Sequence, residues 1–225
     1  IQRSRGLGDV YKRQIYMIRL LNLKSLLLLV ISLNIFSEKN SEIFSFIDDN
    51  AQYFLQLIKN DGNEFESNPE EFKNKLKDIW EPMVDVRLVS RLILNDAYNG
   101  ASEEQIGLFE ERTKKLLLDT YVTTLLEFKE YDIETQTDIR VNKNKTYEVS
   151  VKFSSANAYS FSSKFTIYRN KKNELKIINI IIDGINLGLT FRNQFKDVYR
   201  NSALDLDRAI KNWQPLSSDE IFSDS

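Results

Sequence analysis

The spacing of apolar residues changes along this chain, from a period near 3.6 to a period of 2, close to residue 133. Before that point, apolar side chains recur every three or four residues, which is typical of helices with one buried face. After it, apolar and polar residues alternate, as in strands with one buried face. Helical segments followed by antiparallel strands, with helical segments again at the end, predict an α+β domain.

The helical part before residue 133 divides into four segments. They are expected at about 41–59, 68–81, 83–98 and 103–131. Pro82 separates the second segment from the third, because proline cannot continue the hydrogen bonding of a helix. The fourth begins with the capping box Ser102-Glu-Glu-Gln105 and, if continuous, is about 40 Å long at 1.5 Å per residue.

The alternating part predicts a curved antiparallel sheet of about four strands. They are expected at 134–141, 147–153, 159–167 and 175–182. The last is apolar on both faces, as a central or helix-covered strand would be. Two closing helices are expected at 186–201 and 204–213, followed by a flexible tail at 216–225.

The N-terminal residues do not fit this pattern. Ser4–Gln14, SRGLGDVYKRQ, reads as the translation of a transposase sequencing adapter, so we expect residues 1–14 to be an artefact. Residues 15–37 are typical of a signal peptide, with basic residues ahead of the apolar run Leu26–Leu33 and Ser37 before the expected cleavage. That run is shorter than the roughly 20 residues of a membrane-spanning helix. An uncleaved N-terminal anchor remains the alternative, and a single domain is expected at 38–215.

Charge and composition exclude several classes of function. Residues 1–37 hold six of the 31 basic and one of the 33 acidic residues, so the remaining chain has a net charge of −7. This charge disfavours nucleic acid as a partner and nonspecific binding to anionic lipid surfaces. The chain has no cysteine and no histidine, which removes the commonest general base and metal ligand. With no glycine-rich phosphate loop either, we expect no enzyme activity, no metal and no cofactor. Serines and lysines occur throughout the chain, so a serine–lysine pair stays an open alternative, although nothing selects one.

Bulky apolar stripes occur on several predicted helices and strands at once. Each stripe alone fits an ordinary core, and together they also fit the walls of an apolar cavity. Periodicity does not separate these two interpretations.

Two stretches of motifs resemble the MlaC family, periplasmic phospholipid-binding proteins also called toluene-tolerance proteins. The first stretch, NPEEFKNKLKDIWEPMVDVRLVSRLILNDAYNGASEEQIGLFEERTKKLLLDTYVTTLLEF, carries the pattern at Pro82, Asp85, Arg91, Leu94, Ser102, Gln105, Phe109, Leu117 and Tyr121. The second, IINIIIDGINLGLTFRNQFKDVYRN, carries it at Gly184, Ile185, Leu187, Arg192, Gln194 and Phe195. The resemblance covers Glu42–Trp213, with departures at Asn95, Lys176, Asn179 and Asn186.

The resemblance implies a soluble, monomeric carrier in the periplasm of a Gram-negative bacterium. It would shuttle phospholipid between an outer-membrane lipoprotein/porin complex and an inner-membrane ABC transporter complex, and hold the acyl chains in an apolar cavity between helices and sheet. We expect the lining to be Val89, Leu92, Leu117, Tyr121, Leu125, Val149, Val151, Phe161, Phe165 and Ile167. The alternatives are a cavity-bearing α+β enzyme and a periplasmic binding or chaperone module without lipid.

Overall fold

The computed structural model describes residues 40–222. Contacts divide the chain into two units, Ile1–Glu42 and Ile43–Ser225, and every strand described below belongs to the second. The expected artefact at 1–14 and the expected signal peptide at 15–37 lie outside the described residues. Within the described part, no helix combines the length and the apolar character needed to cross a membrane.

Two helices form a hairpin at the start of this second unit. The first helix ends at residue 61. The short 3-10 helix η1 (Gly62–Glu66) follows, and then α2 (Pro69–Met83). The first residue of α2 is a proline. A backbone N–H at this position has no carbonyl partner within the helix, so a proline there costs no hydrogen bond. Lys75 on α2 contacts the carboxylate of Asp61 at 3.0 Å, so an ion pair joins the two ends of the turn.

The break between α2 and α3 (Val86–Leu94) lies close to Pro82, as the sequence predicts. The chain is extended here, and Val84 forms an isolated parallel bridge with Ile177 of the sheet. The side chain of Asp85 then caps α3 by accepting a hydrogen bond of 2.9 Å from a backbone N–H in the first turn. The break therefore sets the start of α3 beside the sheet.

The longest helix is α4 (Glu103–Leu126), which follows the 3-10 helix η2 (Asn95–Gly100). The predicted capping box is confirmed, because Gln105 N donates to the Ser102 hydroxyl at 3.1 Å and Ser102 N donates to the Gln105 side chain at 3.0 Å. The helix spans about 36 Å at 1.5 Å per residue. It ends earlier than expected, because the chain tightens into the 3-10 helix η3 (Glu127–Glu130).

The sheet has six strands rather than about four, in the order β1-β3-β4-β5-β6 with β2 also paired to β3. The strands are β1 (Asp132–Thr135), β2 (Arg140–Val141), β3 (Tyr147–Ser154), β4 (Phe161–Arg169), β5 (Leu175–Ile182) and β6 (Ile185–Asn186). The expected strand 134–141 is divided in two, and the halves pair antiparallel with opposite ends of β3. The turn at Asp183 and Gly184, both at positive φ, returns the chain as the two-residue strand β6.

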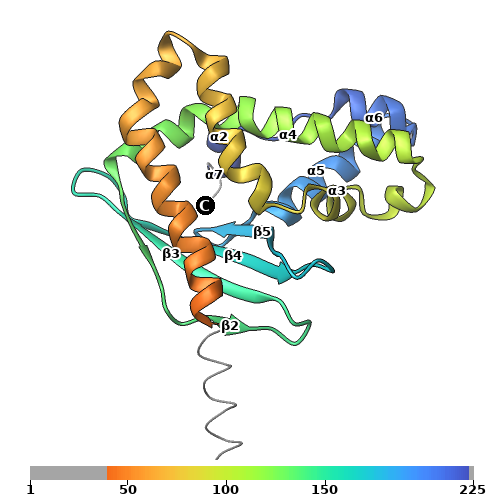
Figure 1. Ribbon diagram of the computed structural model, residues 1–225. Helices are drawn as coiled ribbons and strands as arrows, with labels where there is room; N and C mark the ends of the chain where they lie inside the picture. Colours follow the sequence, from red (N-terminus) through yellow and green to blue (C-terminus); the bar gives the residue numbers. More distant parts are fainter. Residues whose placement is uncertain (1–39, 223–225) are drawn as a thin grey trace, which may run out of the picture. The chain divides into compact units, whose positions relative to one another are not determined.

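One face of this sheet packs against the first helix, and we call it the inner face. Its positions on the two central strands are Tyr147, Val149, Val151 and Phe153 of β3, which pair with Ile167, Phe165, Ser163 and Phe161 of β4. Ile43 and Ile47 of the first helix belong to the same hydrophobic cluster. Figure 1 shows this helix crossing the strands of the sheet. The opposite, outer face carries mainly polar side chains, including Glu148, Lys152, Lys164 and Tyr168.

Three C-terminal helices complete a second hydrophobic cluster. They are α5 (Leu187–Asn201), α6 (Leu206–Asn212) and α7 (Ser218–Phe222). Trp213 is fully buried at the centre of this cluster, with its ring 5.1 Å from the ring of Phe109 on α4. The aromatic contact joins the long central helix to the closing helices.

The end of the described chain differs from the expected flexible tail. Residues Ser218–Phe222 form α7, and Ile221 is buried in the second cluster. The segment before it is held as well, because the hydroxyl of Tyr121 donates to the Leu216 carbonyl at 2.6 Å. A single buried isoleucine in a short polar segment gives no periodic signal, so the sequence pattern did not indicate this helix.

Candidate functional site

The five strand positions expected to line a lipid cavity all lie on the inner face of the sheet, in one hydrophobic cluster. Val149, Val151 and Ile167 are fully buried, whereas Phe161 and Phe165 are half-buried. The neighbouring strand β5 continues this surface, because Ile180 pairs with Phe165 and Ile182 with Ser163, and both isoleucines are half-buried.

A row of small side chains crosses the middle of the inner face. Thr135 pairs with Val151, and Val151 pairs with Ser163, so the row runs from β1 through β3 to β4. Bulky rings border it on one side, where Phe153 and Phe161 stack with centroids 4.6 Å apart. The hydroxyl of Thr135 is buried and has no hydrogen-bond partner. The sequence pattern does not indicate this row, because alternation shows which residues share a face and not which of them pair across strands.

The inner face is uncharged at its centre. No charged side chain occupies the inner-face positions from 147 to 153 on β3 or from 161 to 167 on β4. Within the described residues, no group of three or more Asp, Glu, Cys or His side chains is placed to hold a metal ion. The apolar side chains of this surface suit an apolar ligand.

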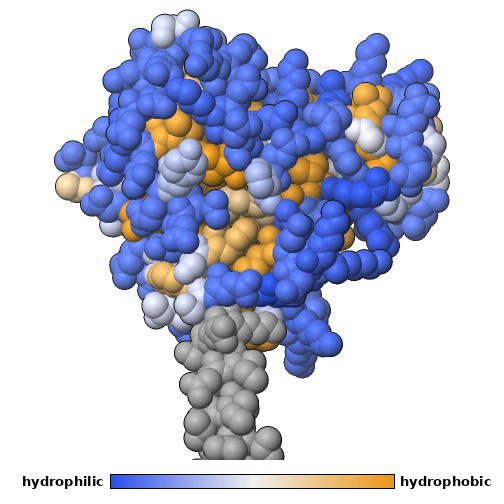
Figure 2. Space-filling model, in the orientation of Figure 1, coloured by the Kyte–Doolittle hydropathy of each residue, from blue (hydrophilic) through white to orange (hydrophobic). Residues whose placement is uncertain are grey.

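The helical residues that cover the inner face come mainly from the first helix. Besides the buried isoleucines, Phe44 and Phe46 pack against it while half-buried. Met83 and Phe128 join them from the end of α2 and from η3. Figure 2 shows hydrophobic residues at the surface beside the first helix, over the region where Figure 1 draws β4 and β5. Phe46 lies off the apolar stripe that identified this helix, so periodicity alone did not indicate it.

The helix positions expected to line the cavity do not belong to the inner-face cluster. Val89, Leu117 and Tyr121 are half-buried against the second cluster, with α5 and α6. Leu125 packs in a third cluster with residues of the first helix and α2, and Leu92 is 44% exposed. The structure thus brings together the strand half of the expected lining. The helix half stays a prediction.

Tyr121 illustrates the surroundings of these helix positions. Its ring packs against Phe191 of α5, with centroids 6.3 Å apart, and its hydroxyl is bonded to a backbone carbonyl. Burial, together with the nearby carboxylate of Glu220, raises the pKa of the Tyr121 phenol. A phenol held neutral and hydrogen-bonded in this way fixes the C-terminal segment against α4.

An open depression lies along α5. It is lined by Thr190, Asn193, Gln194, Asp197, Val198, Asn201 and Leu216. Five of these seven side chains are polar or charged, so the depression does not match an acyl chain.

Several positions of the MlaC-like motifs have clear structural roles. Asp85 and Ser102 cap helices, and Phe109 is fully buried. Two departures from the motif keep such roles: Asn186 caps α5 by accepting from Leu189 N at 3.0 Å, and Asn95 has a φ of 49°. Asparagine tolerates this left-handed backbone better than most residues other than glycine.

The third departure, Asn179, holds the start of α5 against β5. Its side-chain oxygen accepts a hydrogen bond of 3.0 Å from the backbone N–H of Gly188. A Cβ at position 188 would lie 2.5 Å from that oxygen, so the contact requires glycine.

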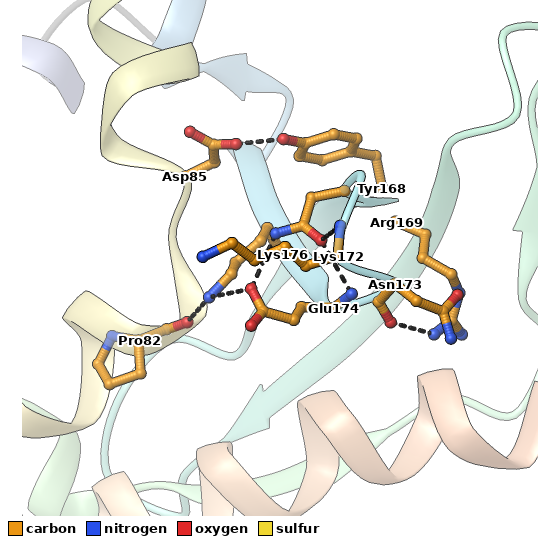
Figure 3. Close-up of polar contacts among 9 residues, drawn as sticks. Pro82, Asp85, Tyr168, Arg169, Lys172, Asn173, Glu174 and Lys176 are labelled. Atoms are coloured by element: carbon orange, nitrogen blue, oxygen red, sulfur yellow. Dashed lines mark hydrogen bonds and ion pairs between the residues drawn. The ribbon is translucent and has the colours of Figure 1, made fainter.

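Polar contacts on the outer face tie the α2–α3 break to β4 and β5 (Figure 3). The hydroxyl of Tyr168 donates to the carboxylate of Asp85. Lys176, the fourth departure, donates to the Pro82 carbonyl at 2.6 Å and lies 3.6 Å from the Glu174 carboxylate. These contacts link chain segments more than 80 residues apart, and they indicate a structural role for this cluster.

Comparisons with known proteins agree with this architecture. The family model described as MlaC protein matches residues 48–215 of the chain. A protein of Pseudomonas putida, named toluene tolerance protein ttg2D, is 32% identical over 157 residues, which cover 69% of this chain and 72% of that protein. A solved structure of a phospholipid-binding protein from Ralstonia solanacearum, in complex with a phospholipid, matches with a TM-score of 0.64. At 21% identity, over 74% of this chain and 92% of that chain, this match shows a shared fold.

Proposed function

The chain belongs to the MlaC protein family, and from this premise we propose that it binds phospholipid through the acyl chains. The name of the Ralstonia solanacearum protein and the phospholipid in its structure support this choice of ligand. The observation that carries the proposal is the uncharged, apolar inner face of the sheet, on which half-buried aromatic and branched side chains surround a row of small ones.

The acyl chains lie, in this proposal, between the inner face and the helical residues that cover it. Burying one methylene group contributes about 0.8 kcal/mol, so two chains of roughly 16 carbons resist transfer through water by on the order of 20 kcal/mol. A carrier therefore has to keep both chains dry, while the charged headgroup stays in water. The row through Val151 and Ser163 leaves the least side-chain volume on this face, and we assign the acyl chains to it.

The expected helix positions remain part of the proposed lining. Support from the packing is stronger for Phe161 and Phe165, which are only half-buried on the inner face, than for Leu117 and Tyr121, which pack against the C-terminal helices.

We further propose that the protein carries its lipid through the periplasm. Its donor and acceptor would be an inner-membrane ABC transporter complex and an outer-membrane lipoprotein/porin complex. Membership of the family and the signal-like segment at 15–37 support this location. Because the inner face offers no catalytic side chains at its centre, the proposal assigns no reaction to the site.

Native mass spectrometry of the purified protein tests lipid binding. We expect a protein ion with an added mass that fits one two-chain phospholipid, and release of that lipid on collisional activation. A protein that is folded by circular dichroism and carries no such mass, even after incubation with phospholipid vesicles, would contradict the proposal. That result would favour a module with a filled core.

A further inference from the structure

Two turns of the sheet lie side by side at the same end. β3 and β4 are antiparallel neighbours, and Tyr147 at the start of β3 pairs with Ile167 near the end of β4. The turn before β3 (142–146) and the turn after β4 (170–174) therefore project from the same end of the sheet, as Figure 1 shows. Neighbouring strands are about 4.8 Å apart, so the two turns lie roughly 10 Å from each other.

The two turns have the same backbone construction. In each, the first asparagine, Asn142 or Asn170, donates its N–H to the carbonyl four residues later, at 2.8 and 2.9 Å. Each also accepts a bond of 3.0 Å on its carbonyl from the N–H three residues later. The residue that donates this bond, Lys145 or Asn173, has a φ of 64° or 66°. Asparagine side chains also accept hydrogen bonds within each turn. These bonds stabilise the backbone from which the exposed side chains project.

Four lysines belong to these two turns: Lys143, Lys145, Lys171 and Lys172. All four are exposed, and none has a carboxylate partner within ion-pair distance among the described residues. The acid of the second turn, Glu174, is already engaged by Asn170 and by Lys176. Within the described part of the chain, none of the four lysines is therefore ion-paired, although Lys172 is near enough to Glu174 to help the hydrogen bond from Asn170 lower the pKa of that carboxyl group.

The net charge of the two turn regions is opposite in sign to that of the chain as a whole. Residues 138–148 and 169–176 contain seven basic and three acidic side chains, although the chain has a net charge of −2. The net charge of −7 for residues 38–225 disfavours anionic lipid surfaces only for that part of the chain as a whole. A local cluster can bind such a surface from a negative protein, because screening limits interactions to about 10 Å.

Lys145 occupies a position that does not favour lysine. A residue other than glycine is uncommon at a φ near +60°, and asparagine adopts this backbone more readily than lysine does. The equivalent position of the second turn is Asn173. Lysine at 145 thus carries a conformational cost that asparagine would lessen, and a role for its charge would account for it.

The geometry points to these two turns as a docking surface for an anionic phospholipid bilayer, with the four lysines close to the headgroup phosphates. Lysine and asparagine are the main residues of the turns, and lysine is depleted in protein–protein interfaces, which rely on aromatic and arginine anchors. A flat anionic surface needs only point charges, and each lysine near it strengthens binding roughly five-fold. Docking through the turns does not depend on a filled lipid site.

Vesicle co-sedimentation tests this surface. The purified protein is mixed with vesicles of phosphatidylglycerol and phosphatidylcholine, or of phosphatidylcholine alone. We expect binding to the first at low salt, weaker binding at physiological salt, and none to the second. The variant Lys143→Gln/Lys145→Asn/Lys171→Gln/Lys172→Gln should bind at least a hundred-fold more weakly.

A matched control separates the location of the charges from their number. Lys115→Gln/Lys129→Gln/Lys196→Gln/Lys211→Gln removes four exposed lysines that lie elsewhere, and we expect it to retain binding. Equal loss in both variants, or no binding of the unaltered protein to anionic vesicles, would overturn the proposal. Lys145→Asn alone should keep or raise the melting temperature and weaken binding about five-fold, which rules out unfolding as the cause. Phe165→Arg, placed in the lipid site, should dock normally, so failure of the lipid-binding proposal is distinguishable.

Discussion

The hydroxyl of Tyr168 on β4 donates a hydrogen bond to the carboxylate of Asp85, the residue that caps α3. The carboxylate accepts a backbone N–H with its other oxygen, so a single side chain joins the start of a helix to the sheet. This link lies on the outer face, opposite the surface proposed to hold lipid. It stabilises the contact between α3 and the sheet, and it places no charged side chain on the inner face.

Replacing Tyr168 with phenylalanine should lower the free energy of unfolding by about 1.5–3 kcal/mol, the usual range for a hydrogen bond to a charged group. Urea denaturation followed by circular dichroism measures this. Tyr159→Phe is the matched control, because Tyr159 is 76% exposed and its change should alter stability by less than about 0.5 kcal/mol. Equal effects of the two changes would contradict a stabilising role for the link.

The same pair predicts a dependence on alkaline pH. Burial first, and then the hydrogen bond and the negative charge of Asp85, raise the pKa of Tyr168 to about 12. In the unfolded chain the phenol ionises near pH 10. The folded state then holds the proton that the unfolded state loses, so this stabilisation is complete below about pH 10 and is lost as the pH rises through about 12. The stability difference between the unaltered protein and Tyr168→Phe should therefore shrink over this interval.

Gly188→Ala should destabilise the contact between α5 and β5. The added Cβ would approach the Asn179 oxygen to 2.5 Å and displace the hydrogen bond that this oxygen accepts. We expect a loss of about 1–3 kcal/mol in unfolding free energy. Gly107→Ala is the control within α4, where nothing lies within 4 Å of the added Cβ. There alanine should stabilise by about 0.5–1 kcal/mol, so opposite signs are expected.

Phe165→Arg should abolish phospholipid binding while the chain stays folded. Phe165 is half-buried on the inner face, so a charge there would contact the acyl chains. Val149 is a poorer position for this test, because it is fully buried and arginine there would unfold the chain. The control is Thr166→Arg, the next residue along β4, which lies on the outer face opposite Glu148. Lipid extraction followed by mass spectrometry should find phospholipid in the control alone.

Much of the fold could be predicted from the sequence, because local patterns determine the elements. Alternation identified β3 to within one residue, and a run that is apolar on both faces identified β5. The capping box fixed the start of α4 at Glu103. Strands of two residues carry no periodic signal of their own. β2 was therefore predicted only as the end of one longer strand at 134–141, and β6 was missed, so the sheet was expected to have about four strands.

The grouping of the expected lining residues on one surface was predictable for the strands and not for the helices. Alternation assigns Val151 and Phe165 to one face without knowledge of their partners. A helix such as α4 has partly buried residues on several sides, and Leu117 faces the C-terminal helices while Leu125 packs near the first helix. Which side meets the sheet depends on how the helices are arranged in space, and the sequence pattern carries no such information.

The central claim is that acyl chains lie against the inner face of the sheet. A phospholipid with a photoactivatable diazirine in one acyl chain, bound and irradiated, followed by peptide mass spectrometry, tests it most directly. The proposal predicts labelled inner-face residues on β3 and β4, among them Val151 and Phe165. Absence of labelling, or labelling confined to outer-face positions such as Lys152 and Lys164, would contradict it.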